Sequence, residues 1–312
     1  MKHLFIINPA AGSRDRTADY TAEIQRLCVG LDYEIAVSQA PGECRRLARE
    51  AALTGEDVRI YACGGDGTLN EVVSGAAGFP NAAVTAWCGG SGNDFVKLFS
   101  EPAAFSDLSR LLDPEEVRFD LIACNDDLAL NICSVGLDAR IGTDVARYKR
   151  LPFFHGFNAN ALSTVANLFR GISEHYIVEV EGQRFDDEQT FVCVCNGRYY
   201  GGGFNPVPDA DPADGKLDVL LVKKVALWQV PGIIGKYKNG RYRELPEFIR
   251  HFRTDRVRII CDGPTPVNLD GELRMAQDVE MRVAREKIHF FYPKNLLLST
   301  ESKAVAPKGE IL

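Results

Sequence analysis

The chain has 312 residues, of which 46% are hydrophobic and 25% are charged, and it carries a net charge of −7. This composition is typical of globular proteins and gives no reason to expect a disordered chain. The length exceeds the size at which one hydrophobic core usually stops growing, so we expect two domains. The negative charge argues against a nucleic-acid partner, because nucleic acids bind through large basic surfaces.

The apolar runs of the sequence are short. Residues 4–7 are shorter than the core of a signal peptide, and charges, Gly or Pro interrupt every later run before it reaches the ~20 residues of a membrane-spanning helix. We therefore expect a cytoplasmic protein without a transmembrane segment, whose contact with a membrane, if it has one, is peripheral.

Nine cysteines, an odd number, lie mostly inside apolar segments, which indicates buried reduced thiols. Cys193 and Cys195 are two residues apart on a predicted strand and should face the same side. Their spacing matches no common zinc motif, so a metal site there is disfavoured.

Residues 2–99 alternate between two patterns. Short apolar runs typical of strands occupy residues 2–8, 33–37, 58–63 and 82–87. Between them, apolar side chains recur at helical spacing, in the sets Tyr20, Ile24, Leu27 and Cys28; Cys44, Leu47, Ala48 and Ala51; and Leu69, Val72, Val73 and Ala76. This βαβαβαβ order predicts a parallel sheet with right-handed crossovers and helices on both faces.

From about Val117 onward the pattern changes to short strands separated by turns. The strand-like segments are residues 118–124, 128–136, 176–182, 190–197, 216–223, 256–263, 279–284 and 287–293. Such spacing is typical of an antiparallel sandwich or barrel. Helical stretches are expected at residues 158–169 and near residues 227–252, and residues 299–312 are expected to be loose.

Three glycine-containing loops follow the first, third and fourth predicted strands: NPAAGS at residues 8–13, GGDGTLNE at 64–71 and GGSGND at 89–94. All should lie at the carboxyl edge of the sheet, where ligands of such folds bind. Exposed backbone amides at a helix N-terminus form an anion site suited to phosphate. Each loop alone could be a tight strand-to-helix turn. Neither the Walker A pattern nor GxGxxG is present.

These motifs carry a family resemblance. GGDGTLNEVV and GGSGNDF resemble the diacylglycerol kinase catalytic-domain family, which includes bacterial lipid kinases and sphingosine kinases. NPAAG, the VRFD segment with Asp120, DADPADGKLDVLLVK and NLDGE follow in the family's order, over about residues 2–294. GGDGT alone is shared with NAD kinases and indicates only a superfamily.

The resemblance implies a Rossmann-like nucleotide-binding domain with a parallel sheet over residues 1–120, which residues 294–312 could complete. An antiparallel β-sandwich domain for substrate and metal would occupy residues 121–293, with ATP held between the domains. The residues implied to hold the nucleotide are Asn8, Ser38, Gly64, Gly65, Asp66, Gly67, Thr68, Asn70, Glu71, Ser91, Gly92, Asn93 and Asp94. The family usually has Thr where Ser38 and Ser91 stand, and the hydroxyl is retained at both.

A kinase of this type needs a proton acceptor for the attacking hydroxyl and Mg²⁺ to neutralise charge. Asp270 and Glu272 in NLDGE would face the same side if they continue a strand, whereas DG is also a common turn dipeptide. By resemblance Glu272 is the catalytic proton acceptor, with Asp270 beside it. The resemblance also implies a structural Mg²⁺ held by the carboxylate of Asp214 and the backbone oxygens of Asp211 and Lys216, with Asp120 among the acidic positions linked to metal. A solvated acidic turn is the alternative.

The expected activity is transfer of the γ-phosphoryl group of ATP to a lipid hydroxyl such as that of diacylglycerol, at a membrane surface. Two segments combine basic and apolar residues suited to an interface. One holds Arg147, Lys149, Arg150, Leu151, Phe153, Phe154 and Phe157, and the other holds Lys236, Lys238, Arg241 and Arg243. The alternatives are a kinase of a soluble substrate such as NAD and a non-catalytic nucleotide-binding sensor. The sequence leaves open a homodimer.

Overall fold

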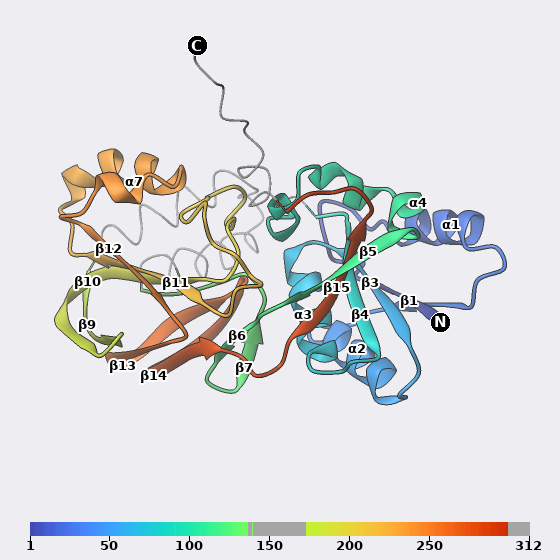
Figure 1. The fold of residues 1–312 in the computed structure, drawn as a ribbon, viewed down its shortest axis with the longest axis horizontal. Coiled ribbons are helices and arrows are strands. Elements are labelled where there is room, and N and C mark those ends of the chain that lie inside the picture. Colours follow the sequence, from blue (N-terminus) through green and yellow to red (C-terminus); the bar gives the residue numbers. More distant parts are fainter. Residues whose placement is uncertain (91, 137–138, 140–172, 299–312) are drawn as a thin grey trace, which may run out of the picture. The chain divides into compact units, whose positions relative to one another are not determined.

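The computed structural model describes residues 1–90, 92–136, 139 and 173–298 (Figure 1). The chain forms two compact units. The first comprises Met1–Phe119 together with the returning chain from Glu286, and the second comprises Asp120–Arg285. Each unit has a sheet of its own.

The first unit contains a six-stranded sheet in the order β2-β1-β3-β4-β15-β5. Its strands are β1 (Lys2–Ile7), β2 (Tyr33–Val37), β3 (Val58–Gly64), β4 (Ala82–Cys88), β5 (Pro114–Phe119) and β15 (Ile288–Pro293). All neighbours are parallel except β15 and β5, which are antiparallel. All residues of β4 are buried, as expected for a parallel strand covered on both faces. The predicted Rossmann-like class is confirmed.

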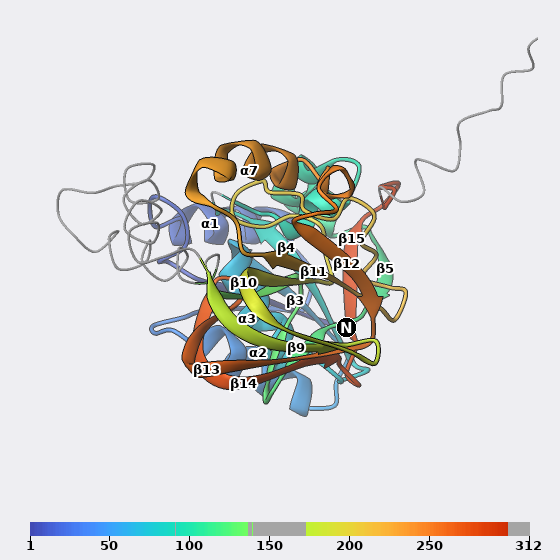
Figure 2. The ribbon, with the colours of Figure 1, turned by 90° about the vertical axis from the view of Figure 1, so that its left-hand side faces the viewer.

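Helices cover both faces of this sheet (Figures 1 and 2). The helical elements are α1 (Thr17–Leu27), α2 (Glu43–Leu53), α3 (Asp66–Ala76), α4 (Leu108–Leu111), η1 (Phe95–Leu98) and η2 (Pro102–Ser106). The predicted apolar face of α3 is buried throughout. The predicted faces of α1 and α2 are buried only in part, because Leu27 of α1 and Leu47 of α2 have intermediate exposure. Gly75 lets α3 approach α2 closely, because a Cβ there would lie 2.3 Å from the Arg45 carbonyl oxygen.

The strand β15 corrects one expectation. We expected residues 287–293 to belong to the second domain, but β15 lies between β4 and β5 of the first sheet. Phe290 and Phe291 are fully buried there. The strand is apolar enough for a core in either unit, so its pattern could not indicate which sheet it joins. Residues 118–124 likewise form two strands, β5 and β6, in different units.

The described residues of the second unit form nine strands: β6 (Ile122–Cys124), β7 (Asp127–Ala129), β8 (Ile132–Gly136), β9 (Glu174–Val180), β10 (Gln183–Cys195), β11 (Leu217–Lys223), β12 (Ile249–Thr254), β13 (Arg256–Leu269) and β14 (Glu272–Val283). They follow the order β12-β11-β10-β8-β13-β14-β6-β7, and β9 pairs with both β10 and β13. Every pairing is antiparallel. Because β8 and β9 each join β10 to β13, the sheet encloses an apolar core, and the expected antiparallel class is confirmed.

A second apolar cluster of this unit packs beneath α7 (Val230–Lys238) and the short η3 (Leu227–Gln229) and η4 (Tyr242–Glu244). The expected helical stretch at residues 227–252 is therefore only partly right. Residues 249–252 belong to β12, which pairs with β11 from Ile249 to Thr254. Gly240, with a φ of 68°, follows the helix and ends its periodicity. No helix among the described residues is long and apolar enough to cross a bilayer. The expectations for residues 158–169 and 299–312 lie outside the described residues.

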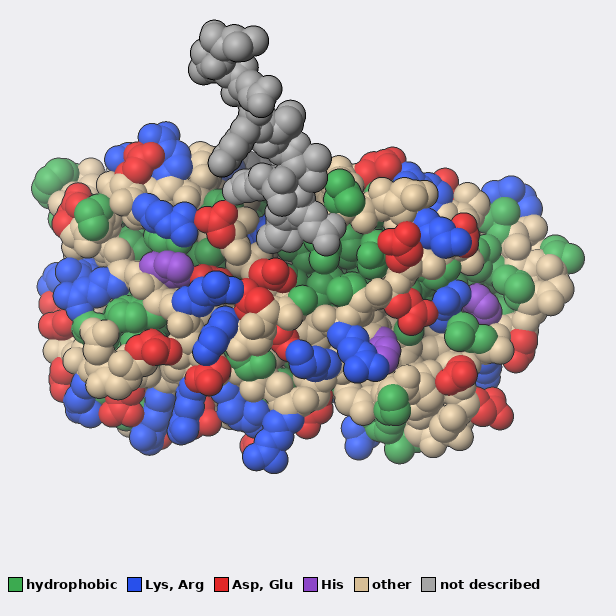
Figure 3. Space-filling view, viewed as in Figure 1, with side chains coloured by type: hydrophobic (Ala, Val, Ile, Leu, Met, Phe, Trp, Pro, Cys, Tyr) green, Lys and Arg blue, Asp and Glu red, His purple; other side chains and the backbone are tan. Residues whose placement is uncertain are grey.

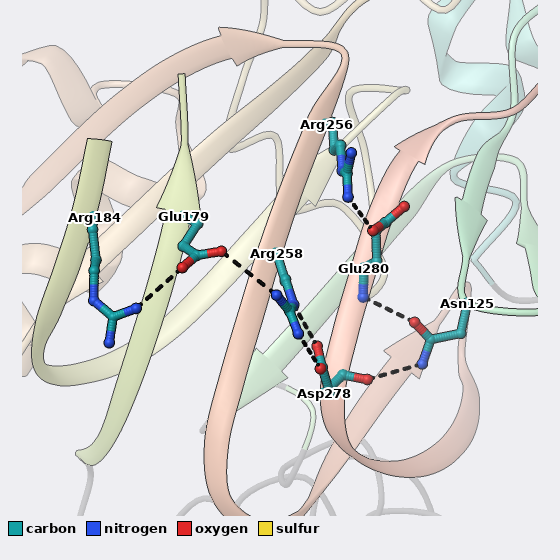
Figure 4. A network of polar contacts seen from close by, with 7 residues as sticks. All are labelled: Asn125, Glu179, Arg184, Arg256, Arg258, Asp278 and Glu280. Carbon is teal, nitrogen blue, oxygen red and sulfur yellow. Dashed lines mark hydrogen bonds and ion pairs between the residues drawn. The ribbon is translucent and has the colours of Figure 1, made fainter. Parts of the chain in front are cut away.

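Charged side chains are interspersed over the second unit (Figure 3). On β13 and β14, Arg258 pairs with Asp278 at 2.6 Å and Arg256 with Glu280 at 2.6 Å (Figure 4). The Asn125 side chain joins this network by hydrogen bonds to the β14 backbone at 2.9 and 3.1 Å. Arg258 holds the pKa of the Asp278 carboxyl below its usual value. Exposed pairs of this kind contribute about 0–1 kcal/mol each, so they mainly reinforce strand register.

All nine cysteines are buried and unbridged, which agrees with the expectation of reduced thiols. Cys193 and Cys195 face the same side of β10, with their Sγ atoms 3.6 Å apart. Within the described part of the chain, no group of three His, Cys, Asp or Glu residues is placed to hold a metal ion.

Candidate active site

The three glycine loops of the first unit meet at the carboxyl ends of β1, β3 and β4. The Asn8 side-chain amide donates to the Thr68 hydroxyl at 3.0 Å, which joins the first loop to the second. The Gly64 carbonyl accepts from the amides of Gly89 and Gly90 at 2.8 and 3.1 Å, which joins the second loop to the third. The convergence predicted from the sequence is present.

The close contacts between these loops are possible only because the residues at them are glycines, which have no side chain. A Cβ on Gly90 would lie 2.5 Å from the Gly65 Cα atom. Gly12 adopts a φ of 82°, and a Cβ on it would lie 2.8 Å from the Gly89 carbonyl oxygen. Such distances are shorter than any ordinary Cβ contact, so only glycine lets the backbones approach. The result is a surface of packed main chain at the N-terminus of α3, where the helix dipole favours anions.

Asp66 links the second glycine loop to the third by hydrogen bonds. It is the first residue of α3, and its Oδ1 accepts from the amides of Asp94 at 2.6 Å and Phe95 at 3.3 Å. Burial and the negative charge of Asp94 raise the pKa of Asp66. Asp94 is itself buried and pairs with Lys97 at 2.5 Å. Asp66 is thus a half-buried structural contact rather than a residue of a freely exposed loop.

Three other residues expected at the nucleotide are engaged elsewhere or buried. Glu71 accepts from the amides of Gly42 and Cys44, at 3.0 and 3.1 Å, so its carboxylate caps the start of α2 instead of facing the glycine loops. Ser38 is buried, and its amide donates to Ile7 at the end of β1. Asn70 is also buried.

The GSGND loop is closed by Asn93, which has a φ of 47° and donates to the Gly90 carbonyl at 3.0 Å. Gly92 lies against Asp66, because a Cβ on it would be 2.8 Å from the Asp66 Oδ2 atom. Gly67 is exposed. Ser91 lies outside the described residues.

The catalytic carboxylates proposed from the sequence do not continue a strand. Asp270 and Gly271 have φ values of 49° and 93° and form a two-residue turn, while Leu269 pairs with Glu272 across the hairpin of β13 and β14. Asp-Gly is the sequence that favours such a turn, because both central residues need positive φ. The geometric premise that placed both side chains on one strand face was wrong, and the turn interpretation describes this segment.

Asp270 fastens this turn to the start of β8. Its carboxylate accepts from the backbone amides of Leu130 at 2.7 Å, Asn131 at 2.9 Å and Ile132 at 2.6 Å. Its own amide donates back to the Ile132 carbonyl at 3.1 Å. The carboxylate therefore fixes the position of the turn and of the residue that follows it, Glu272.

An arginine links Glu272 to a second acidic residue that sequence analysis missed. Arg274 pairs with Glu272 at 3.0 Å and with Asp127 of β7 at 2.9 Å. Asp127 is more than 140 residues earlier in the chain, so no local spacing could have indicated the contact. Arg274 orients the Glu272 carboxylate and balances its charge.

The residues expected to bind a structural metal are brought together. Asp120 is buried and accepts from the Gly215 amide at 2.8 Å. The carboxylates of Asp211 and Asp214 accept from loop amides two residues on, at 3.0 and 2.9 Å. The other oxygen of Asp214 pairs with Arg253. Burial raises the pKa of Asp214, and Arg253 opposes that shift.

One oxygen of each of these carboxylates thus accepts from a backbone amide, and the Asp211 carbonyl, one of the two backbone oxygens expected at the metal, accepts from the Asp214 amide at 3.4 Å. A Mg²⁺ ion would have to displace Arg253 to reach the second oxygen of Asp214. The chemistry of the donors is suitable for a hard cation, but each carboxylate already has a protein partner. Lys216 is exposed, and its amide is the donor to Asp214.

Comparison with known proteins assigns the family. Residues 2–124 match the diacylglycerol kinase catalytic domain, and residues 131–291, more than half of the chain, match the YegS C-terminal NAD kinase beta sandwich-like domain. The chain belongs to the diacylglycerol kinase catalytic-domain family. The two matches correspond to the parallel and antiparallel units described above.

Family relatives span nearly the whole chain. A Staphylococcus carnosus protein named "Putative lipid kinase" is 25% identical over 87% of this chain and 89% of its own length. A Staphylococcus epidermidis protein of the same name is 26% identical over 83% and 82%. A Bacillus anthracis structure described as a "putative diacylglycerol kinase" is 23% identical, with a TM-score of 0.74, and covers 94% of this chain and 97% of that one. At this identity the structural likeness shows the fold alone.

Proposed function

We propose that this kinase-family chain transfers the γ-phosphoryl group of ATP to a lipid hydroxyl such as that of diacylglycerol. The observation that carries the proposal is the convergence of the three glycine loops, whose main chains pack at the N-terminus of α3. A phosphate chain is the ligand that such a surface suits, because exposed amides and the helix dipole attract anions. Family membership favours a lipid acceptor.

In this proposal the first unit holds the nucleotide. The backbone of residues 64–68 would cradle the phosphates, and Asn8, through its bond to Thr68, would keep the first loop against them. Asp66 positions the GSGND loop through the amides of Asp94 and Phe95. Glu71 acts by fixing α2 rather than by touching the nucleotide.

Mg²⁺ would be held with the nucleotide by Asp66 and Asp94. The fit rests on geometry: the Oδ2 atoms of Asp66 and Asp94 would lie 2.8 and 3.7 Å from a Cβ on Gly92, so both face the same space, while their Oδ1 atoms contact protein donors. A cation there would offset the repulsion between the two carboxylates. The bound ion would supply neutralisation of the phosphate charge.

We assign the proton transfer to Glu272. A carboxylate that accepts the proton of the acceptor hydroxyl makes the oxygen a better nucleophile as the new P–O bond forms. Asp270 is a positioning residue, because its carboxylate is already engaged with three backbone amides. Arg274 orients Glu272.

The second unit has two apolar features that suit a lipid acceptor. An apolar pocket of about 70 Å³ lies beneath α7, lined by residues of β10, β11, α7 and β12 that include Phe191, Val222 and Ile233. It has room for a few methylene groups. Trp228 and Ile234 on the same segment are 80% and 45% exposed, which suits contact with an apolar surface.

The basic residues expected at this interface are mostly engaged within the protein. Lys236 and Arg241 pair with Glu244 at 3.5 and 2.7 Å, and Arg243 pairs with Asp209 at 2.9 Å. Attraction to an anionic membrane would therefore compete with these pairs. The other expected basic and aromatic segment, residues 147–157, lies outside the described residues.

The test is a panel of acceptors offered with ATP labelled in its γ-phosphate: diacylglycerol, a sphingoid base, a polyprenol and NAD. We expect labelled lipid phosphate from at least one lipid alcohol and none from NAD. Label on NAD alone would replace the proposal with a soluble-substrate kinase. ATP binding without transfer to any acceptor would favour a nucleotide sensor.

A further inference from the structure

The acidic loop at residues 209–218 of the second unit is contacted by basic side chains of the same unit. Three of its carboxylates each pair with one basic residue: Asp209 with Arg243 at 2.9 Å, Asp218 with His251 at 2.6 Å, and Asp214 with Arg253. All three partners come from η4 and β12. Because β12 is hydrogen-bonded along β11, which begins at Leu217 near the end of the loop, the strand holds its partners in register with the loop.

Arg253 occupies the carboxylate on which a structural metal would depend. The Asp214 Oδ1 atom accepts from the Lys216 amide at 2.9 Å, and Oδ2 pairs with the Arg253 guanidinium. The Asp214 side chain is 20% exposed and that of Arg253 is 54% exposed. The Asp214 side chain is partly shielded from water, so a positive partner stabilises its charged form.

A second guanidinium binds a backbone oxygen of the same loop. Arg198 is 5% exposed, and its Nε atom donates to the Ala210 carbonyl at 2.7 Å. Carboxylate and backbone carbonyl oxygens are the two kinds of ligand that Mg²⁺ and Ca²⁺ take in acidic loops. In this chain, arginine N–H groups bind one carboxylate, that of Asp214, and one backbone carbonyl, that of Ala210.

We propose that Arg253, with Arg198, is the resident counter-ion of the 209–218 loop and performs the structural task for which the family resemblance suggests a second Mg²⁺. The loop then keeps its conformation without a metal ion. Removing the Arg253 charge leaves Asp214 uncompensated, so that a divalent cation becomes stabilising in its place. This inference concerns the folding of the second unit and does not depend on which alcohol the chain phosphorylates.

The experiment is thermal unfolding of the full chain without nucleotide, in EDTA and in excess Mg²⁺, with ionic strength matched by KCl because salt screens exposed ion pairs. Arg253→Met removes the charge and keeps an unbranched side chain, and Arg253→Lys keeps the charge. Arg250→Met is the matched control: it lies on the same strand, but its guanidinium stacks over the Phe185 ring at 4.6 Å. Any Mg²⁺ bound elsewhere affects all variants equally.

We expect Arg253→Met to melt about 2 °C below the parent in EDTA, as for loss of a partly exposed ion pair. Mg²⁺ should raise its Tm by at least that much more than it raises the Tm of the parent, because a ligand of the native state stabilises by mass action. Arg253→Lys and Arg250→Met should respond to Mg²⁺ as the parent does. Adding Asp214→Asn to Arg253→Met should abolish the extra response.

Two results overturn the proposal. If Mg²⁺ stabilises the parent and Arg253→Met equally, Arg253 does not stand in place of a metal. If Arg253→Met melts with the parent in EDTA, the arginine is only a solvated surface side chain. Neither result bears on phosphoryl transfer, so the proposed function stands or falls separately.

Discussion

Gly90→Ala should separate the second and third glycine loops and disable nucleotide binding. The added Cβ would lie 2.5 Å from the Gly65 Cα atom, whereas ordinary contacts begin near 3.4 Å. The two backbones must therefore move apart by about 1 Å. Overpacking of this kind costs about 1–3 kcal/mol of stability, and a displacement of about 1 Å at a reacting group lowers turnover about 10²-fold.

Gly67→Ala is the matched comparison. Apart from its chain neighbours and the backbone of its own helix, no atom of the described residues lies within 4 Å of a Cβ at Gly67, so this variant should melt with the parent. If phosphate approaches the Gly67 backbone, however, the methyl group will weaken ATP binding. Melting temperature and ATP affinity, measured by calorimetry for both variants, separate the two effects. Parent-like melting and ATP affinity in Gly90→Ala would refute the close-packing argument, and full ATP affinity in Gly67→Ala would remove Gly67 from the phosphate site.

Three further predictions address the second unit. Glu272→Gln should lower kcat about 10²–10⁴-fold with little change in the KM for ATP, because it removes a proton acceptor and keeps the size and shape of the side chain. A rise in the KM for ATP alone would mean that Glu272 has only a binding role. Asp270→Asn should lower the free energy of unfolding by about 1.5–3 kcal/mol in urea titrations, since it weakens charge-assisted bonds to three amides; unchanged stability would show that these bonds matter little. His175 hydrogen-bonds Asp262 and Asp186, and both contacts raise the pKa of its imidazole. The contribution of these contacts to the free energy of unfolding should therefore be complete below about pH 6 and should disappear as the pH rises through the raised pKa. Urea midpoints of parent and His175→Gln should therefore differ at acidic pH and converge at alkaline pH, and a constant difference would exclude the titration.

Local patterns predicted local structure well. The helical spacing of Leu69, Val72 and Val73 identified the buried face of α3, because periodicity reports directly which side of an element meets the core. The three loops could be placed together from strand order alone, since parallel strands end at one edge. Family membership followed from motifs that occur in those loops.

Contacts between distant residues could not be predicted in this way. Nothing near Arg274 in the sequence indicates that it pairs with Asp127, and nothing near Asp214 indicates Arg253. The placement of β15 in the first sheet is likewise a choice between two apolar cores. At Asp270 the Asp-Gly dipeptide correctly predicted a turn. The expected catalytic role had instead favoured a continued strand.

The most direct test of the central claim is phosphoryl transfer to diacylglycerol in lipid vesicles, with Mg²⁺ and ATP labelled in its γ-phosphate. We predict labelled phosphate in the lipid fraction with the parent, and a rate at least about 10²-fold lower with Glu272→Gln at saturating ATP. Transfer at the parental rate by Glu272→Gln would contradict the assigned chemistry. Label that appears only in NAD, with none in this or any other lipid alcohol, would contradict the claim that the chain is a lipid kinase.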